Sequence, residues 1–187
     1  MRMTSCVTAL VVAAVVALPV GAAIKAMNLG ELMSITDDAV YGTIVKTESI
    51  RLDAPWPNAV YTQITVQGES LRSGESGRFE LVFHGSHDRA DDYVISEMPA
   101  LQDVRLGGET VVFFEANVED VFGKNVVHNW GNLYRVERVF GAPVVLGKGE
   151  GSAFELNAGL QEVRTRVSSA HAAILVSGKK KIPGLAK

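Results

Sequence analysis

The feature that most constrains this chain is a ten-residue stretch, residues 58–67, in which two kinds of side chain alternate. One set of alternate positions holds Val60, Thr62, Ile64 and Val66, and the other holds Tyr61, Gln63, Thr65 and Gln67. Successive side chains of a β-strand point to opposite faces, so this period of two predicts a strand that is buried on one face only. A chain built from such strands must form a sheet and protect the edges of that sheet.

Further strand signals recur along the chain and are separated by turn sequences. They lie at residues 38–51, 78–84, 93–96, 109–116, 133–140, 143–146 and 152–156. The run Val111-Val112-Phe113-Phe114 is apolar on both faces and predicts a central strand. Residues 117–132 are rich in turn-forming residues, and we expect a loop there.

Two segments have helical spacing. A short helix or helical turn is expected within residues 28–38. Near the C-terminus, apolar residues recur at three- and four-residue steps and form one stripe: Leu160, Val163, Val167, Ala170, His171 and Ile174. Asn157 is placed to cap the start of this second helix, and Glu162 and Arg166 have the i,i+4 spacing of an ion pair.

Short strands with one long helix at the end favour a mainly β fold over a parallel α/β sheet. We expect a small, partly open antiparallel barrel of the OB type, followed by a C-terminal amphipathic helix. A mature chain of roughly 160 residues is one domain by size. The expected division is a signal peptide at residues 1–23, a β-barrel domain at 24–157, and the helix with a basic tail at 158–187.

The leader has the composition of a secretory signal peptide. Arg2 supplies a basic start, residues 6–20 are almost free of polar groups, and Gly21-Ala22-Ala23 offers small residues for cleavage. The alternative is an uncleaved membrane anchor, since residues 6–24 approach the roughly 20 residues that cross a bilayer. The alanine-rich run favours cleavage. We therefore expect a periplasmic or extracellular bacterial protein with no transmembrane domain in the mature chain.

Cysteine and charge limit the chemistry further. The single cysteine, Cys6, lies in the leader, so the mature chain has neither a disulfide nor a thiol. Removing Arg2 from the 18 Lys and Arg leaves 17, against 21 Asp and Glu. This acidic balance excludes nucleic acid as the expected partner. The lysines at positions 179–181 and 187 are interpreted as a solvated tail, with a membrane-surface or cell-wall contact as the alternative.

Three stretches carry a family resemblance: DAVYGTIV at residues 38–45, VYTQITV at 60–66 and LGGETVVFF at 106–114. Together they resemble a broad set of bacterial secreted domains of unknown function. The resemblance covers residues 38–156 and implies a partly open OB-type barrel, similar to the netrin-like barrel of the tissue metalloproteinase inhibitors. Those inhibitors act through an N-terminal cysteine. The mature chain has none, so their mechanism is not carried over.

The densest group of chemically active side chains lies at residues 84–92. Its candidate ligands for a divalent metal are His84, His87, Asp88 and Asp91, because imidazoles suit Zn²⁺ or Cu²⁺ and carboxylates suit Ca²⁺. The alternative is a solvated polar loop. We favour this loop and assign no cofactor, since the spacing matches no calcium loop and the chain has no His-Glu-x-x-His motif.

Aromatic residues in turn sequences offer a second kind of site. Trp56 lies in Pro-Trp-Pro and Trp130 lies in Asn-Trp-Gly. OB-type barrels bind ligands across one sheet face and its flanking loops. The candidate ligand-binding residues are therefore Trp56, Trp130, Tyr61 and Gln63, with a glycan or a peptide as ligand. The alternative is that each indole folds back and covers the core.

Two functional hypotheses remain open. The first is a non-enzymatic binding or interaction module of the cell envelope, whose partner is an envelope protein, a peptide or a glycan. The second is a metal-binding or metal-dependent hydrolytic protein centred on residues 84–92. No Gly-x-Ser-x-Gly elbow supports a serine hydrolase, so an enzyme is the less favoured hypothesis.

Overall fold

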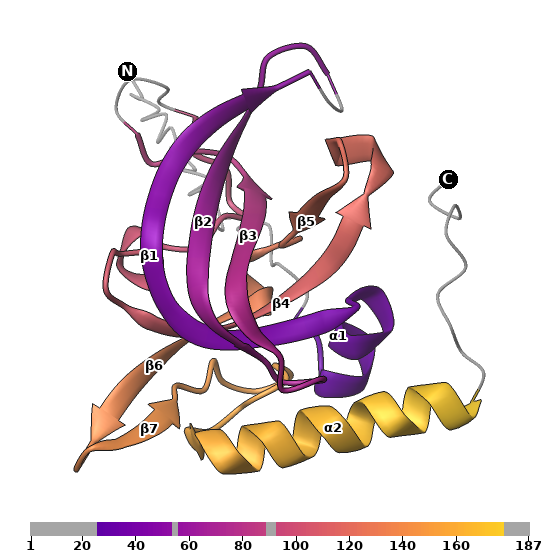
Figure 1. The fold of residues 1–187 in the computed structure, drawn as a ribbon. Helices are drawn as coiled ribbons and strands as arrows, with labels where there is room; N and C mark the ends of the chain where they lie inside the picture. The colour runs from indigo at the N-terminus through magenta and orange to yellow at the C-terminus, as the bar shows by residue number, and fades with distance from the viewer. Residues whose placement is uncertain (1–25, 54–55, 89–92, 178–187) are drawn as a thin grey trace, which may run out of the picture.

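The computed structural model describes residues 26–53, 56–88 and 93–177 and consists mainly of β-strands, with a helix before them and a helix after them (Figure 1). The strands are β1 (Asp38–Leu52), β2 (Ala59–Ser70), β3 (Ser76–His84), β4 (Glu109–Val118), β5 (Lys124–Val126), β6 (Leu133–Val139), β7 (Ala142–Val145) and β8 (Ala158–Gly159). The helices are α1 (Leu29–Ile35) and α2 (Leu160–Ser177), and three short 3₁₀ turns are η1 (Leu101–Asp103), η2 (Glu119–Val121) and η3 (Trp130–Asn132).

Among the described residues, five strands close into a small barrel in the order β1-β2-β3-β5-β4, and β4 pairs again with β1. All neighbours are antiparallel except β3 and β5, which are parallel. Strands β6, β7 and β8 extend the sheet from β4. The predicted fold class, a mainly β, OB-like barrel with a C-terminal helix, is confirmed. The prediction had a partly open, antiparallel barrel, whereas the described strands close, and they include the parallel pair β3–β5.

Two expectations about individual segments are wrong. The loop predicted over residues 117–132 contains β5, whose three residues pair with both β3 and β4. The strands predicted at residues 93–96 and 152–156 do not form. In the second of these, Phe154 is fully buried and joins a cluster of core side chains instead of a ladder. In the first, Ile95 packs against the core inside the barrel.

Strand β1 is long and bends sharply, as Figure 1 shows. Two features allow the bend. Gly42 lies opposite Gly68 of β2, and a Cβ added to Gly42 would lie 2.4 Å from the carbonyl oxygen of Gln67, so the strands approach closely only without a side chain here. Immediately after, the register shifts between Ile44 and Lys46, which is a β-bulge that turns the strand further.

Two apolar cores lie on the two sides of β4, because its side chains alternate. Val112 and Phe114 point into the barrel, where they pack against residues of β1, β2 and β3. Val111 and Phe113 point outwards to a second core formed with β6, β7 and both helices. All four side chains are 4% exposed or less, which confirms the central strand predicted for this run.

The helices cover the second core. Asn28 and Glu31 form a capping box at the start of α1, and Glu162 pairs with Arg166 on α2 at 3.6 Å, as predicted. The predicted cap Asn157 is wrong, because its side chain accepts a hydrogen bond from the backbone of Gly147 at 2.9 Å and β8 separates it from the helix. No helix in the described part of the chain combines the length and the apolar character needed to cross a bilayer.

Candidate functional site

The face of β2 that carries Tyr61 and Gln63 points away from the barrel interior. Ile64 and Val66 pack inside the barrel, so the alternate residues face outwards. We call the outward side of β1, β2, β3 and β5 the outer face. The half-buried strand predicted for residues 58–67 is wrong, because positions 59–66 are buried on both faces.

Part of the outer face is covered by the connection between β4 and β5. Val121 of η2 packs in one apolar cluster with Ala59, Tyr61 and Val82. This contact leaves Tyr61 only 4% exposed. The tyrosine therefore supports the outer face and offers little surface of its own to a ligand.

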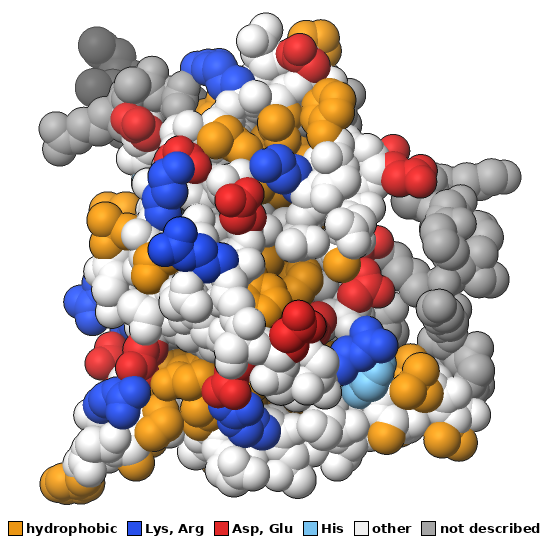
Figure 2. All heavy atoms as spheres, in the orientation of Figure 1, with side chains coloured by type: hydrophobic (Ala, Val, Ile, Leu, Met, Phe, Trp, Pro, Cys, Tyr) orange, Lys and Arg blue, Asp and Glu red, His pale blue; other side chains and the backbone are white. Residues whose placement is uncertain are grey.

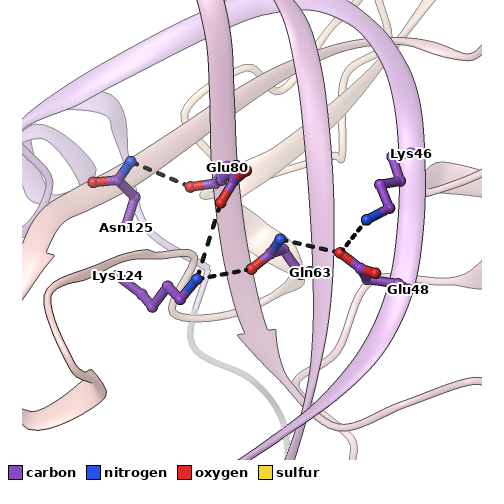
Figure 3. Close-up of polar contacts among 6 residues, drawn as sticks. All are labelled: Lys46, Glu48, Gln63, Glu80, Lys124 and Asn125. Atoms are coloured by element: carbon purple, nitrogen blue, oxygen red, sulfur yellow. Dashed lines mark hydrogen bonds and ion pairs between the residues drawn. The ribbon is translucent and has the colours of Figure 1, made fainter.

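A row of polar side chains crosses four strands beside this cluster (Figure 3). The amide of Gln63 donates from Nε2 to Oε1 of Glu48 at 3.2 Å and accepts at Oε1 from Nζ of Lys124 at 3.1 Å. Lys46 donates to the same Glu48 oxygen at 2.8 Å, and Lys124 lies 3.9 Å from a carboxylate oxygen of Glu80. Each end of the Gln63 amide thus has a charged partner, which satisfies a side chain that is only 7% exposed.

An aromatic cluster centred on His84 lies at the end of the outer face. The ring centroids of Trp56, Tyr61 and Tyr93 lie 5.0, 5.3 and 5.3 Å from that of His84. Tyr61 lies directly opposite His84 in the β2–β3 ladder, whereas Trp56 comes from the β1–β2 connection and Tyr93 from the segment after β3. We call these four residues the His84 cluster.

The imidazole of His84 is held in an unusual environment. Its Nε2 atom is buried and has no hydrogen-bond partner among the described residues. Burial lowers the pKa of His84 below 6.5, and the carboxylate of Glu97 partly opposes this shift. The neutral ring therefore prevails at neutral pH and packs as an aromatic side chain.

The members of the His84 cluster differ in how much of each side chain is exposed. Trp56 is 46% exposed and Tyr93 is 37% exposed, whereas Tyr61 is buried. Two aromatic side chains from different segments, both in contact with one histidine, thus remain exposed. The predicted ligand-binding residues do not include Tyr93, because no local pattern shows that it packs against His84 at the end of the preceding strand.

Trp130 lies in a different environment from Trp56. Nζ of Lys148 lies 4.3 Å from the Trp130 ring centroid and 5.0 Å from that of Tyr134, and it donates to the backbone oxygen of Trp130. Burial lowers the pKa of Lys148 to about 8, partly opposed by Asp103. Of the four predicted ligand-binding residues, the structure therefore brings together Trp56, Tyr61 and Gln63 on the outer face, and no described ring contact links Trp130 to them.

The predicted metal ligands do not share one arrangement in the described part of the chain. His84 belongs to the aromatic cluster, while Nε2 of His87 lies 2.7 Å from the carbonyl oxygen of Pro99. His87 and Asp88 line a cavity of about 220 Å³. Asp91 lies outside the described residues. Within the described ranges no three His, Cys, Asp or Glu side chains are grouped as a metal site would require, and the metal hypothesis stays a prediction.

Comparisons of this chain with protein-family models, with curated proteins and with solved structures found no match.

Proposed function

We propose that this protein is an exported, non-enzymatic binding module of the bacterial cell envelope and that its ligand is a glycan. The observation that carries the proposal is the His84 cluster, in which Trp56 and Tyr93 expose their rings beside a half-buried histidine. Aromatic faces pack against the C–H faces of sugar rings, and a few placed polar groups then orient the ligand.

The polar row favours a glycan over a nucleic acid. Lys46, Glu48 and Lys124 present ammonium and carboxylate groups on the same face as the cluster, and the buried amide of Gln63 holds Glu48 and Lys124 in place. Sugar hydroxyls both donate and accept hydrogen bonds, so they match a mixed row of this kind. A nucleic acid needs a predominantly basic surface, which an acidic chain with alternating Lys and Glu does not supply.

The strand pairing favours a glycan over an extended peptide. A peptide that adds to a sheet needs a strand with one unpaired edge. Where Tyr61 and Gln63 lie, β2 is paired on both edges, with β1 and with β3, and β3 is paired with β5 at Leu81 and Val82. Recognition here therefore uses side chains, as expected for a sugar.

Tryptophan fluorescence tests this proposal, because the chain has two tryptophans and replacing either one leaves a single indole to report on binding. In Trp130→Phe the only indole is Trp56, and in Trp56→Phe it is Trp130. We expect soluble peptidoglycan fragments or chitotetraose to change the fluorescence of Trp130→Phe and to bind it in a calorimeter with the affinity of the parent protein. Binding to Trp56→Ala or Tyr93→Ala should fall at least tenfold. A parent protein that binds neither probe, or that binds them equally well without Trp56, overturns the proposal, and binding of envelope peptides alone overturns the glycan assignment.

Export is tested separately. The intact mass of the protein recovered from the periplasm or medium should correspond to cleavage after Ala22 or Ala23. Full-length protein retained in the membrane fraction would instead show an uncleaved anchor.

A further inference from the structure

A cavity of about 220 Å³ lies at one end of the barrel interior, between β1, β2 and the segment that follows β3. Its described lining includes Thr47, Thr62, Ser86, His87, Asp88 and Val104. Thr62 lies on the same face of β2 as Ile64, and both Ile64 and Val104 belong to the core inside the barrel. The cavity therefore adjoins that core at the mouth of the barrel, which is a preferred place for a ligand.

Three side chains of the lining have already committed their hydrogens to the backbone. Oγ1 of Thr62 donates to the carbonyl oxygen of Gly85 at 2.8 Å, and Oγ1 of Thr47 donates to another backbone carbonyl oxygen at 3.0 Å. Nε2 of His87 lies 2.7 Å from the carbonyl oxygen of Pro99. Because a carbonyl oxygen only accepts, Nε2 carries the hydrogen, and Nδ1 of the neutral ring is an acceptor. All three side chains can therefore still accept a hydrogen bond.

Ser86 supplies the opposite function. Its side chain is 1% exposed, and its Oγ atom accepts a hydrogen bond from the backbone nitrogen of Asp88 at 2.9 Å. The hydroxyl hydrogen of Ser86 has no acceptor among the described residues. A buried donor without an acceptor is costly, so this hydroxyl group favours an occupant of the cavity that can accept.

Charge and metal chemistry narrow the class of occupant. Asp88 brings a carboxylate, and no Lys or Arg is among the described residues that line the cavity, which disfavours an anion. Figure 2 shows basic and acidic side chains interspersed over the strands that face the viewer, so the visible surface around the barrel has no single sign of charge. The described lining also lacks the three grouped ligands that a metal site requires.

We propose that this cavity binds a single unit of a neutral sugar. Sugar hydroxyl groups both donate and accept, so they match the acceptors of Thr47, Thr62 and His87 and the donor of Ser86. The volume lies below the roughly 300–1,000 Å³ of pockets for drug-sized ligands, which favours one ring over a chain. The lining residues are not members of the His84 cluster, and the inference therefore stands or falls independently of the glycan proposal.

The test is a titration of isotope-labelled protein with D-glucose, D-galactose and D-mannose, followed through backbone amide chemical shifts. At least one of these sugars should shift the amides of Ser86, His87 and Asp88 in a saturable way. Cyclohexanemethanol, a ring of similar size with one hydroxyl group, should not. Thr62→Val and Ser86→Ala each remove a hydroxyl group from the cavity and should weaken sugar binding about fivefold. Thr62→Val nearly keeps the shape of the side chain and stays informative where Ser86→Ala lowers the melting temperature.

Matched controls separate the cavity from hydroxyl groups in general. Thr165→Val and Ser34→Ala remove hydroxyl groups from exposed helix positions and should bind the sugar like the parent protein. Trp56→Ala should also bind it normally, and loss of binding in this variant would place the sugar at the His84 cluster and overturn the proposal. No saturable shift with any of the three sugars, equal shifts with cyclohexanemethanol, or undiminished binding by both cavity variants overturns it too. Shifts caused by Ca²⁺ or Zn²⁺ but by no sugar overturn it in favour of a metal site.

Discussion

The imidazole of His84 meets the indole of Trp56 edge to face, with 5.0 Å between ring centroids and 72° between ring planes. This is a favoured geometry for two aromatic rings. Trp56 belongs to a connection between strands, and His84 lies at the end of β3. The contact therefore ties an exposed loop residue to the rigid sheet and fixes part of the proposed ligand surface.

Stability below neutral pH should depend on His84. Because burial lowers the pKa of His84 in the folded protein, the unfolded chain takes up a proton near pH 6.5 while the folded protein does not, and the free energy of unfolding falls as the pH drops through this range. His84→Phe keeps a ring and removes the titration. The parent protein should lose more stability than this variant between pH 7 and pH 5 in urea titrations, by less than the limiting slope of about 1.4 kcal/mol per pH unit because His84 is only partly buried. Parallel losses in the two proteins would contradict the prediction.

Lys148 predicts a trend of the same sign in the alkaline range. Burial lowers the pKa of Lys148 from 10.5 to about 8, so between these values the unfolded chain keeps the proton that the folded protein has released. Stability relative to Lys148→Met should therefore rise with pH, by about 3 kcal/mol between pH 7 and pH 10.5. The check is the difference in unfolding free energy between the two proteins at each pH. A difference that does not change with pH would show that the rings of Trp130 and Tyr134 hold the charge.

The buried amide of Gln63 should contribute measurably to folding. Gln63→Met removes hydrogen bonds to Glu48 and Lys124 and should lower the free energy of unfolding by about 1 kcal/mol. Gln67→Met is the matched control, since Gln67 lies on the same face of β2 but is exposed. Its effect should stay within about 0.5 kcal/mol. Urea denaturation distinguishes the two, and equal effects would show that the polar row is energetically neutral.

The close approach of β1 and β2 at Gly42 should not tolerate a side chain at this position. Gly42→Ala places a methyl group against the backbone of Gln67 and Gly68 and should lower the unfolding free energy by about 3 kcal/mol. Gly77→Ala is the control, because nothing lies within 4 Å of the added Cβ and its strand conformation accepts alanine. That variant should be unchanged or up to about 1 kcal/mol more stable. Melting temperatures measure both, and a stable Gly42→Ala would show that the strands can move apart.

Local patterns predicted the elements well where a segment is long and regular. The alternation in residues 58–67 marks β2, and the apolar stripe that includes Val163 and Val167 marks α2. The same patterns failed at β5, because three residues are too few to show a period. They also failed at residues 152–156, where the side chain of Phe154 packs in the second core instead of joining a strand. The second face of β2 was also unpredictable, since Val121 covers it from a distant segment.

The candidate site was only partly accessible to sequence reasoning. Trp56, Tyr61 and Gln63 were identified from turn composition and strand alternation, and the structure places all three on the outer face. Tyr93 and Lys124 were missed, and His84 was assigned to a metal hypothesis. Lys124 meets Gln63 from a strand that is remote in the chain, and Tyr93 meets His84 through the fold of the segment after β3, which has no local pattern.

The amino-acid sequence by itself determined the strand-rich character, the terminal helix, the acidic balance of the chain and the absence of any cysteine other than Cys6, because each depends on composition or on the spacing of nearby residues. Only the tertiary structure decided how the barrel closes through β3 and β5, which rings surround His84, and where Lys148 is buried. These are long-range contacts, and their energies depend on burial and distance that no local pattern records.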